Sequence, residues 1–64
     1  MKRRRLLKYL RDHGCELLRE GRRHSVYWNP VIRRVSTVPR HTEIPYKLVR
    51  KICRDLGIPP PRER

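Results

Sequence analysis

Apolar residues recur at helical spacing near the start of the chain. In residues 3–13 they form a stripe of Leu6, Leu7 and Leu10, and Lys and Arg occupy the opposite side. A period close to 3.6 residues is typical of an amphipathic helix with one buried face. The pattern therefore predicts a short helix, which Gly14 ends.

A second stretch with the same period lies near the other end of the chain. Its apolar stripe consists of Leu48, Val49, Ile52, Cys53 and Leu56. Pro45 suits the first turn of a helix, and Thr42 or Glu43 is expected near the N-terminal cap. Gly57 follows the last apolar residue and predicts the end of this second helix.

Between the two predicted helices, three short segments have the composition of β-strands. Residues 15–21 end at a glycine, residues 24–30 are rich in β-branched and aromatic residues, and residues 34–39 end at a proline. The short gaps between them favour antiparallel hairpins. The predicted order is α-β-β-β-α, an α+β fold with a three-stranded antiparallel sheet and both helices on one face. The double-stranded RNA-binding domain has this arrangement, although a fold alone does not assign a function.

At 64 residues, the chain has room for one domain, which we place at residues 1–58. Residues 59–64 are proline-rich and charged, and we expect this tail to be disordered. No apolar run is long enough for a signal peptide or a membrane span, so the expected location is the cytoplasm. There, Cys15 and Cys53 should stay reduced and buried, and they are too few for a zinc site.

Positive charge is the strongest signal in the composition. The chain has 18 Lys and Arg residues against 6 Asp and Glu, a net charge of +12, and the cations are spread along its whole length. Such a charge attracts polyanions through counterion release. RNA, DNA, an acidic protein and an anionic membrane all fit, and charge alone does not choose among them.

One histidine stands out as a candidate catalytic residue. His24 starts the second predicted strand, next to Arg22 and Arg23, and Arg19 lies on the strand before it. The nearby positive charge favours the neutral imidazole, which is the form that acts as a general base. In RNA this base would take the proton of a 2′-hydroxyl, and the arginines would bind the phosphate and stabilise its charge. A histidine that only hydrogen-bonds the turn, or contacts nucleic acid without catalysis, is also compatible with this spacing.

Two further pairs of residues are candidates for contacts with RNA. His41 lies in the segment RHTEI, where a general acid, a phosphate contact and a plain surface residue are all open roles, and Arg40 before it is a candidate phosphate contact. Tyr27 and Trp28 point to opposite faces of the predicted sheet. One of them should enter the core and the other could stack on a base, and the sequence does not say which.

Other kinds of chemistry find little support in the sequence. It has no glycine-rich phosphate loop, no HExxH or CxxC metal motif and no serine with matched catalytic partners. The six acidic residues are scattered and form no convincing Mg²⁺ site. A ribonuclease built on these residues would therefore use histidine, with no metal and no other cofactor.

Three segments in a fixed order carry a resemblance to a known family. They are LLKYLRDHGCELLREG, the strand RHSVYWNP, and VPRHTEI before the second helix. Across residues 3–58 the chain resembles the HicA toxins, small ribonucleases of bacterial and archaeal toxin–antitoxin pairs. The resemblance implies a fold of the double-stranded RNA-binding type and cleavage of mRNA through one histidine, here His24. It also implies a HicB antitoxin that covers the active surface.

The chain departs from the family pattern just before this histidine. Arg22 and Arg23 stand where small residues, often Gly and Ser, are common in the family. His41 matches a recurring family position, which does not by itself assign it a role. We therefore predict a toxin that acts as a metal-independent endoribonuclease on mRNA. The alternatives are a non-catalytic RNA-binding module of the same fold and a basic DNA-binding or ribosome-associated protein.

Overall fold

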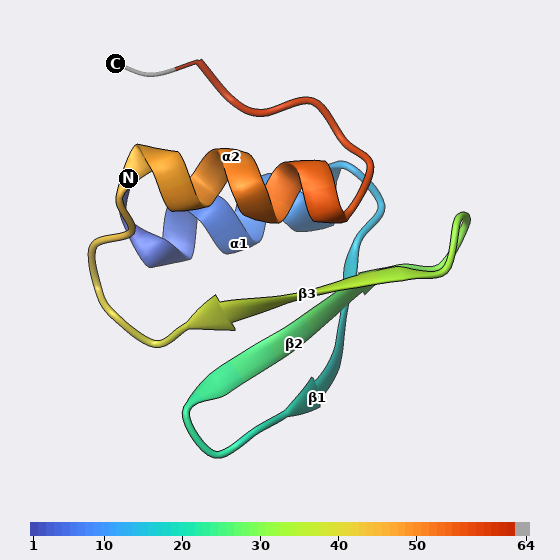
Figure 1. Cartoon of the computed structure of the whole chain (residues 1–64), viewed down its shortest axis with the longest axis horizontal. Coiled ribbons are helices and arrows are strands. Elements are labelled where there is room, and N and C mark those ends of the chain that lie inside the picture. The colour runs from blue at the N-terminus through green and yellow to red at the C-terminus, as the bar shows by residue number, and fades with distance from the viewer. Residues whose placement is uncertain (63–64) are drawn as a thin grey trace.

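Two helices and three strands follow one another in the predicted order (Figure 1). The computed structural model describes residues 1–62. The elements are α1 (Arg3–Asp12), β1 (Glu16–Glu20), β2 (His24–Asn29), β3 (Arg34–Pro39) and α2 (Tyr46–Asp55). The α-β-β-β-α order and the α+β class are confirmed. No helix in the described part of the chain is long and apolar enough to span a membrane.

The three strands form one antiparallel sheet in the order β1-β2-β3, so β2 is the central strand. Both helices lie over one face of the sheet, and the other face is open (Figure 1). The apolar stripes of the helices meet the sheet in a single core, where Leu6, Leu10, Val49 and Ile52 are buried. Burial of these side chains is the main favourable contribution to the folding of so small a domain.

Side chains along β2 alternate between the covered and the open face of the sheet. Tyr27 belongs to the core beneath the helices. Since alternate residues of a strand share a face, Ser25 and Asn29 point the same way, and both are buried. The residues of β2 on the open face are therefore His24, Val26 and Trp28.

The edge strand β1 is irregular. Its register with β2 shifts between Leu17 and Arg19, where a β-bulge interrupts the ladder. A bulge of this kind bends and twists an edge strand and makes it a poor template for pairing with another chain. All residues of β1 are exposed, so this strand mainly supplies side chains to the surface.

Thr42 and Glu43, expected near the N-terminal cap of α2, do not cap this helix. Pro45 is the N-cap residue, and no side chain caps the helix by a hydrogen bond. The carboxylate of Glu43 instead lies 3.0 Å from the N-terminal amine of Met1 and 3.5 Å from Lys2 Nζ. Ion pairs with the start of the chain thus hold Glu43 away from the helix.

The segment after α2 turns back along the helices (Figure 1). Tyr9 Oη donates a hydrogen bond to the Pro59 carbonyl (2.6 Å), and Tyr46 Oη donates one to the Pro61 carbonyl (2.7 Å). Both helices therefore contact the proline-rich tail. The disorder expected for residues 59–64 stays a prediction, and the last two of these residues lie outside the described part of the chain.

Both cysteines are free thiols buried in the core. Burial raises the pKa of the Cys53 thiol to about 11, and the nearby Cys15 adds to this shift. Burial also raises the pKa of Cys15. Both thiols are therefore protonated near neutral pH and act as small apolar side chains.

Candidate active site

His24 is the first residue of β2 and lies opposite Pro39, the last residue of β3. Its side chain is exposed on the open face of the sheet. Within residues 1–62, the hydrogen bonds of His24 use its backbone and leave the imidazole unengaged. The ring is therefore accessible to a substrate that approaches from the solvent.

Two other predicted contact residues share the open face with His24. Arg19 of β1 pairs with Val26, and Trp28 lies further along β2. A rise of about 3.3 Å per residue separates the Cα atoms of His24 and Trp28 by roughly 13 Å. Tyr27 points to the covered face and is only 5% exposed. Its burial removes Tyr27 as a candidate for base stacking and leaves Trp28.

Arg40 holds the turn between β1 and β2. Its Nη1 donates to the Arg22 carbonyl (2.9 Å), and its Nη2 donates to the Gly21 carbonyl (2.6 Å) and to Glu20 Oε1. The same turn is closed by the Gly21 N–H, which donates to the His24 carbonyl (2.7 Å). The sequence suggests Arg40 as a phosphate contact, whereas in the structure its guanidinium bonds to the protein. These hydrogen bonds tie Arg40 to the backbone that carries His24, and the predicted phosphate contact of Arg40 stays a prediction.

A polar network beneath this turn has no counterpart in the sequence prediction. Arg3 of α1 donates from Nη2 to Ser25 Oγ (2.7 Å) and from Nε to the Pro39 carbonyl (2.9 Å). Ser25 Oγ in turn donates to Glu20 Oε1 (2.8 Å). Since Ser25 is only 1% exposed, these partners satisfy a hydroxyl that burial would otherwise penalise. The available sequence signal is the alternation of β2, which places this serine on the same face as Tyr27.

Glu20 joins the two parts of this arrangement. Hydrogen bonds from Arg40 and Ser25 hold the pKa of the Glu20 carboxyl below its ordinary value. The group is therefore ionised at neutral pH, where it attracts both Arg40 and the nearby Arg3. Through this carboxylate, α1 and the segment after β3 both fix the turn that presents His24.

The remaining predicted cations surround the same end of the sheet. Arg22 and Arg23 are exposed at the tip of the turn, and within residues 1–62 neither forms an ion pair with a carboxylate. His41 lies just beyond the end of β3 and is also exposed. No hydrogen bond in the described residues joins His41 to His24. The structure thus brings these side chains to one end of the sheet, with His24 alone mounted on a strand.

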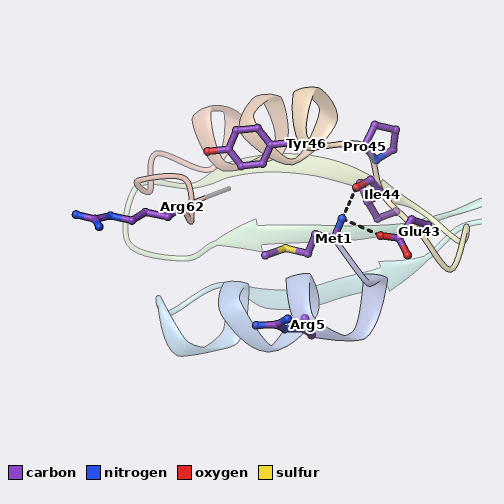
Figure 2. Close-up of a pocket in the computed structure, with 7 residues that line it drawn as sticks. All are labelled: Met1, Arg5, Glu43, Ile44, Pro45, Tyr46 and Arg62. Carbon is purple, nitrogen blue, oxygen red and sulfur yellow. Dashed lines mark hydrogen bonds and ion pairs between the residues drawn. The ribbon is translucent and has the colours of Figure 1, made fainter. Parts of the chain in front are cut away.

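A pocket of about 290 Å³ lies elsewhere, beside the first turns of α1 and α2 (Figure 2). Its charged groups do not converge on a common point. The Met1 amine is paired with Glu43 and donates to the Ile44 carbonyl (2.9 Å), and the guanidinium groups of Arg5 and Arg62 lie far apart (Figure 2). None of the predicted site residues lines this pocket. The candidate active site is therefore the end of the open face at His24.

Comparison with known proteins agrees with the resemblance noted in the sequence. A family model described as "HicA toxin of bacterial toxin-antitoxin" matches residues 3–58 of the 64-residue chain. The matched range begins at α1, ends after α2 and includes the whole candidate site. No curated protein and no solved structure shows a significant match. The chain belongs to the HicA toxin family of bacterial toxin–antitoxin systems.

Proposed function

We propose that this HicA family member is an endoribonuclease that cleaves mRNA, with His24 as its general base. The position of His24 carries the proposal. Its ring is exposed and unengaged on the open face, while Arg40 and the Gly21 N–H hold the turn that presents it. A general base needs an accessible ring on a rigid mount, and His24 has both.

In the proposed reaction, His24 takes the proton of a ribose 2′-hydroxyl. The 2′-oxygen then attacks the adjacent phosphorus, and the bond between that phosphorus and the 5′-oxygen breaks. The departing 5′-oxygen receives a proton from His41 or from water. The products are a 2′,3′-cyclic phosphate and a 5′-hydroxyl end, so finding only 5′-phosphate ends would exclude this route.

The cations around His24 suit the charge of the substrate. Arg22 and Arg23 are exposed beside the base, and guanidinium groups form paired hydrogen bonds with phosphate oxygens. Arg19 adds positive charge on the open face, and the half-buried Trp28 offers a ring on which a base can stack. We infer that the RNA strand lies along the open face from the turn toward Trp28.

The residues near His24 favour a reaction that needs no metal ion. Glu20 is the carboxylate nearest to His24 in the sequence, and Arg40 and Ser25 already bond to it. A divalent cation would have to compete with both for its oxygens. Within residues 1–62, no group of three or more His, Cys, Asp or Glu side chains could hold a metal ion.

Membership of a toxin–antitoxin family implies an antitoxin partner. We propose a HicB-type antitoxin that covers the open face around His24, in the cytoplasm where mRNA is translated. The net charge of +12 suits an acidic surface on that partner. Occlusion predicts that a purified pair no longer cleaves RNA and that crosslinks map to the open face. Unchanged cleavage, or crosslinks far from His24, would contradict it.

The central experiment compares His24→Ala with the wild-type protein on a structured mRNA in EDTA, read on a sequencing gel. General base catalysis contributes about 10²–10⁴-fold, so the variant should lose cleavage by that factor. His13→Ala is the matched control, because His13 is an exposed histidine at the C-cap of α1. Circular dichroism checks that both variants fold. Equal cleavage by all three proteins would show that His24 is not the general base.

A non-catalytic RNA-binding module remains the second candidate function. It is favoured by the absence, within residues 1–62, of any hydrogen bond that orients the imidazole of His24. Arg22 and Arg23 also make this turn bulkier than the small residues common in the family. The same gel separates the two candidates, since a binder shifts RNA with a steep salt dependence and leaves it intact.

A further inference from the structure

Besides the arginines around His24, a second group of cations lies on the side of the β1–β2 turn that faces α1. A pocket of about 530 Å³ opens between the first turn of α1 and the segment after β3. We call it the basic pocket, and its lining residues are Lys2, Arg3, Arg4, Leu7, Arg40 and Thr42. The cations come from two segments far apart in the sequence, so the fold itself gathers them.

Two arginines of the basic pocket form hydrogen bonds with residues near His24. Arg40 lines the pocket and donates to the backbone carbonyls of Gly21 and Arg22. Arg3 lines it as well and donates to Ser25, the residue after His24. The pocket therefore lies within the length of an arginine side chain from the residues that flank the proposed base.

The carboxylates at this end of the molecule neutralise only part of its charge. Glu20 accepts from Arg40, and Glu43 pairs with Lys2 and the N-terminal amine. Two of the four cations that line the basic pocket thus have a carboxylate partner.

The other two cations have no such partner within residues 1–62. Arg3 bonds to two uncharged groups, the Pro39 carbonyl and the Ser25 hydroxyl. Arg4 is exposed, and none of the ion pairs in the described residues involves it. The basic pocket therefore holds positive charge that an anion can still neutralise.

The chemistry of the lining matches a phosphodiester. One guanidinium group can donate two parallel hydrogen bonds to phosphate oxygens, and the Thr42 hydroxyl can donate one more. Leu7 offers an apolar wall against which a ribose can lie. None of the lining residues is aromatic, so the pocket is suited to the backbone of a nucleic acid and not to stacking of a base.

We propose that the basic pocket binds a backbone phosphate of the RNA adjacent to the one held at His24, with Arg4 as its principal ligand. The inference rests on the proposed ribonuclease function. An RNA strand that lies along the open face must continue past the turn, and Arg40 leads from the turn into the pocket. The substrate path therefore runs from Trp28 past His24 to the first turn of α1.

The test measures binding of a short labelled single-stranded RNA by fluorescence anisotropy at several salt concentrations. All proteins carry His24→Ala, so that the RNA stays intact. Arg4→Gln should weaken binding on the order of tenfold, since it removes a charge-assisted hydrogen bond. It should also lower the slope of log K against log salt by about 0.7, the value for one phosphate on a single strand.

Arg50→Gln is the matched control, because Arg50 is an exposed arginine that lines a different depression near the end of α2. This variant loses the same charge and should change affinity by less than about twofold. Arg4→Lys keeps the charge but loses the fork of donors, so it should keep the salt slope and bind with intermediate affinity. Glutamine and lysine are good helix formers, and all three variants should keep the wild-type circular dichroism.

Equal losses of RNA affinity for Arg4→Gln and Arg50→Gln would overturn the proposed phosphate site in the basic pocket, because Arg4 would then act only through its general charge. If the protein with His24 intact cleaves RNA in that case, only the pocket fails and the ribonuclease stands. The reverse result is also informative. If the protein with His24 intact leaves RNA uncleaved while Arg4→Gln alone weakens binding, the proposed ribonuclease function is contradicted. The basic pocket is then supported as part of an RNA-binding surface.

Discussion

The two faces of the sheet are stabilised by different interactions. The covered face is packed with apolar side chains, and its buried polar groups have partners, such as Asn29 Nδ2, which donates to the Leu56 carbonyl (2.9 Å). Within the described residues, no buried side-chain nitrogen or oxygen lacks a hydrogen bond. The open face carries His24, Arg19 and the half-exposed Val35, whose side chains meet solvent. The polar groups of the covered face find partners within the fold, whereas the side chains of the open face remain exposed to solvent.

We expect this contrast to separate the residues that maintain the domain from those that bind the proposed substrate. A chain of 64 residues has a total stability of roughly 3–10 kcal/mol, so one core side chain is a large fraction of it. Exposed side chains away from special features usually change stability by no more than about 0.5 kcal/mol. Substitutions on the covered face should therefore lower the free energy of unfolding, whereas substitutions on the open face should mainly weaken RNA binding.

The largest effect is expected on the covered face, from Leu10→Ala. Leu10 is fully buried in α1, and truncation of a buried leucine costs about 2–5 kcal/mol through lost burial and the cavity left behind. Much of the chain should unfold at moderate urea concentration, as circular dichroism would show. Leu18→Ala is the control on the exposed strand β1 and should lose far less stability. Similar urea midpoints for the two variants would contradict the contrast between the faces.

An intermediate effect, chiefly on binding, is expected from Trp28→Ala on the open face. Stacking of a base on an aromatic ring is worth about 1–3 kcal/mol, so the affinity for single-stranded RNA should fall about 5–150-fold. Val35→Ala is the matched control, because Val35 is the apolar residue directly opposite Trp28 on β3. Equal losses of affinity for the two variants would show that no base stacks on the ring.

The smallest effect is expected from Glu20→Gln and depends on pH. The pKa of Glu20 is lowered in the folded protein, chiefly by hydrogen bonds from Arg40 and Ser25. Its contribution to stability is therefore complete above its unfolded pKa of about 4.5 and is lost as the pH falls through the lowered folded value. Wild type and variant should differ in free energy of unfolding at pH 7 and converge in acid. A difference that stays constant with pH would argue against the ion pair.

The order of the elements could be predicted from the sequence because helix and strand periods are local properties. The stripe of Leu6, Leu7 and Leu10 defines α1, and the five segments appear where the pattern places them. The face on which Trp28 lies could not be predicted, because alternation fixes only that it is opposite to Tyr27. Burial of Tyr27 in the core settles that choice.

The polar part of the candidate site depends on contacts between distant segments, and these have no local signal. The sequence offers Arg40 only as a candidate phosphate contact, and its hydrogen bonds to the turn at Gly21 depend on where β3 places it. Glu43 reads as a helix cap until the amine of Met1 meets it. His24 could be proposed from the sequence because it starts a predicted strand beside Arg22 and Arg23, whereas the partners that hold this turn could not be predicted.

The contact between Gly57 and Ile32 has a consequence for the evolution of the family. Gly57 ends α2 with a φ of +69°, which an asparagine can also adopt at modest cost. Here a Cβ at position 57 would meet Ile32 Cδ1, the end of an exposed side chain in the hairpin between β2 and β3, and this side chain would have to move aside. An asparagine at position 57 should therefore be tolerated when the side chain at position 32 moves toward solvent, and a smaller residue at position 32 would remove the contact altogether.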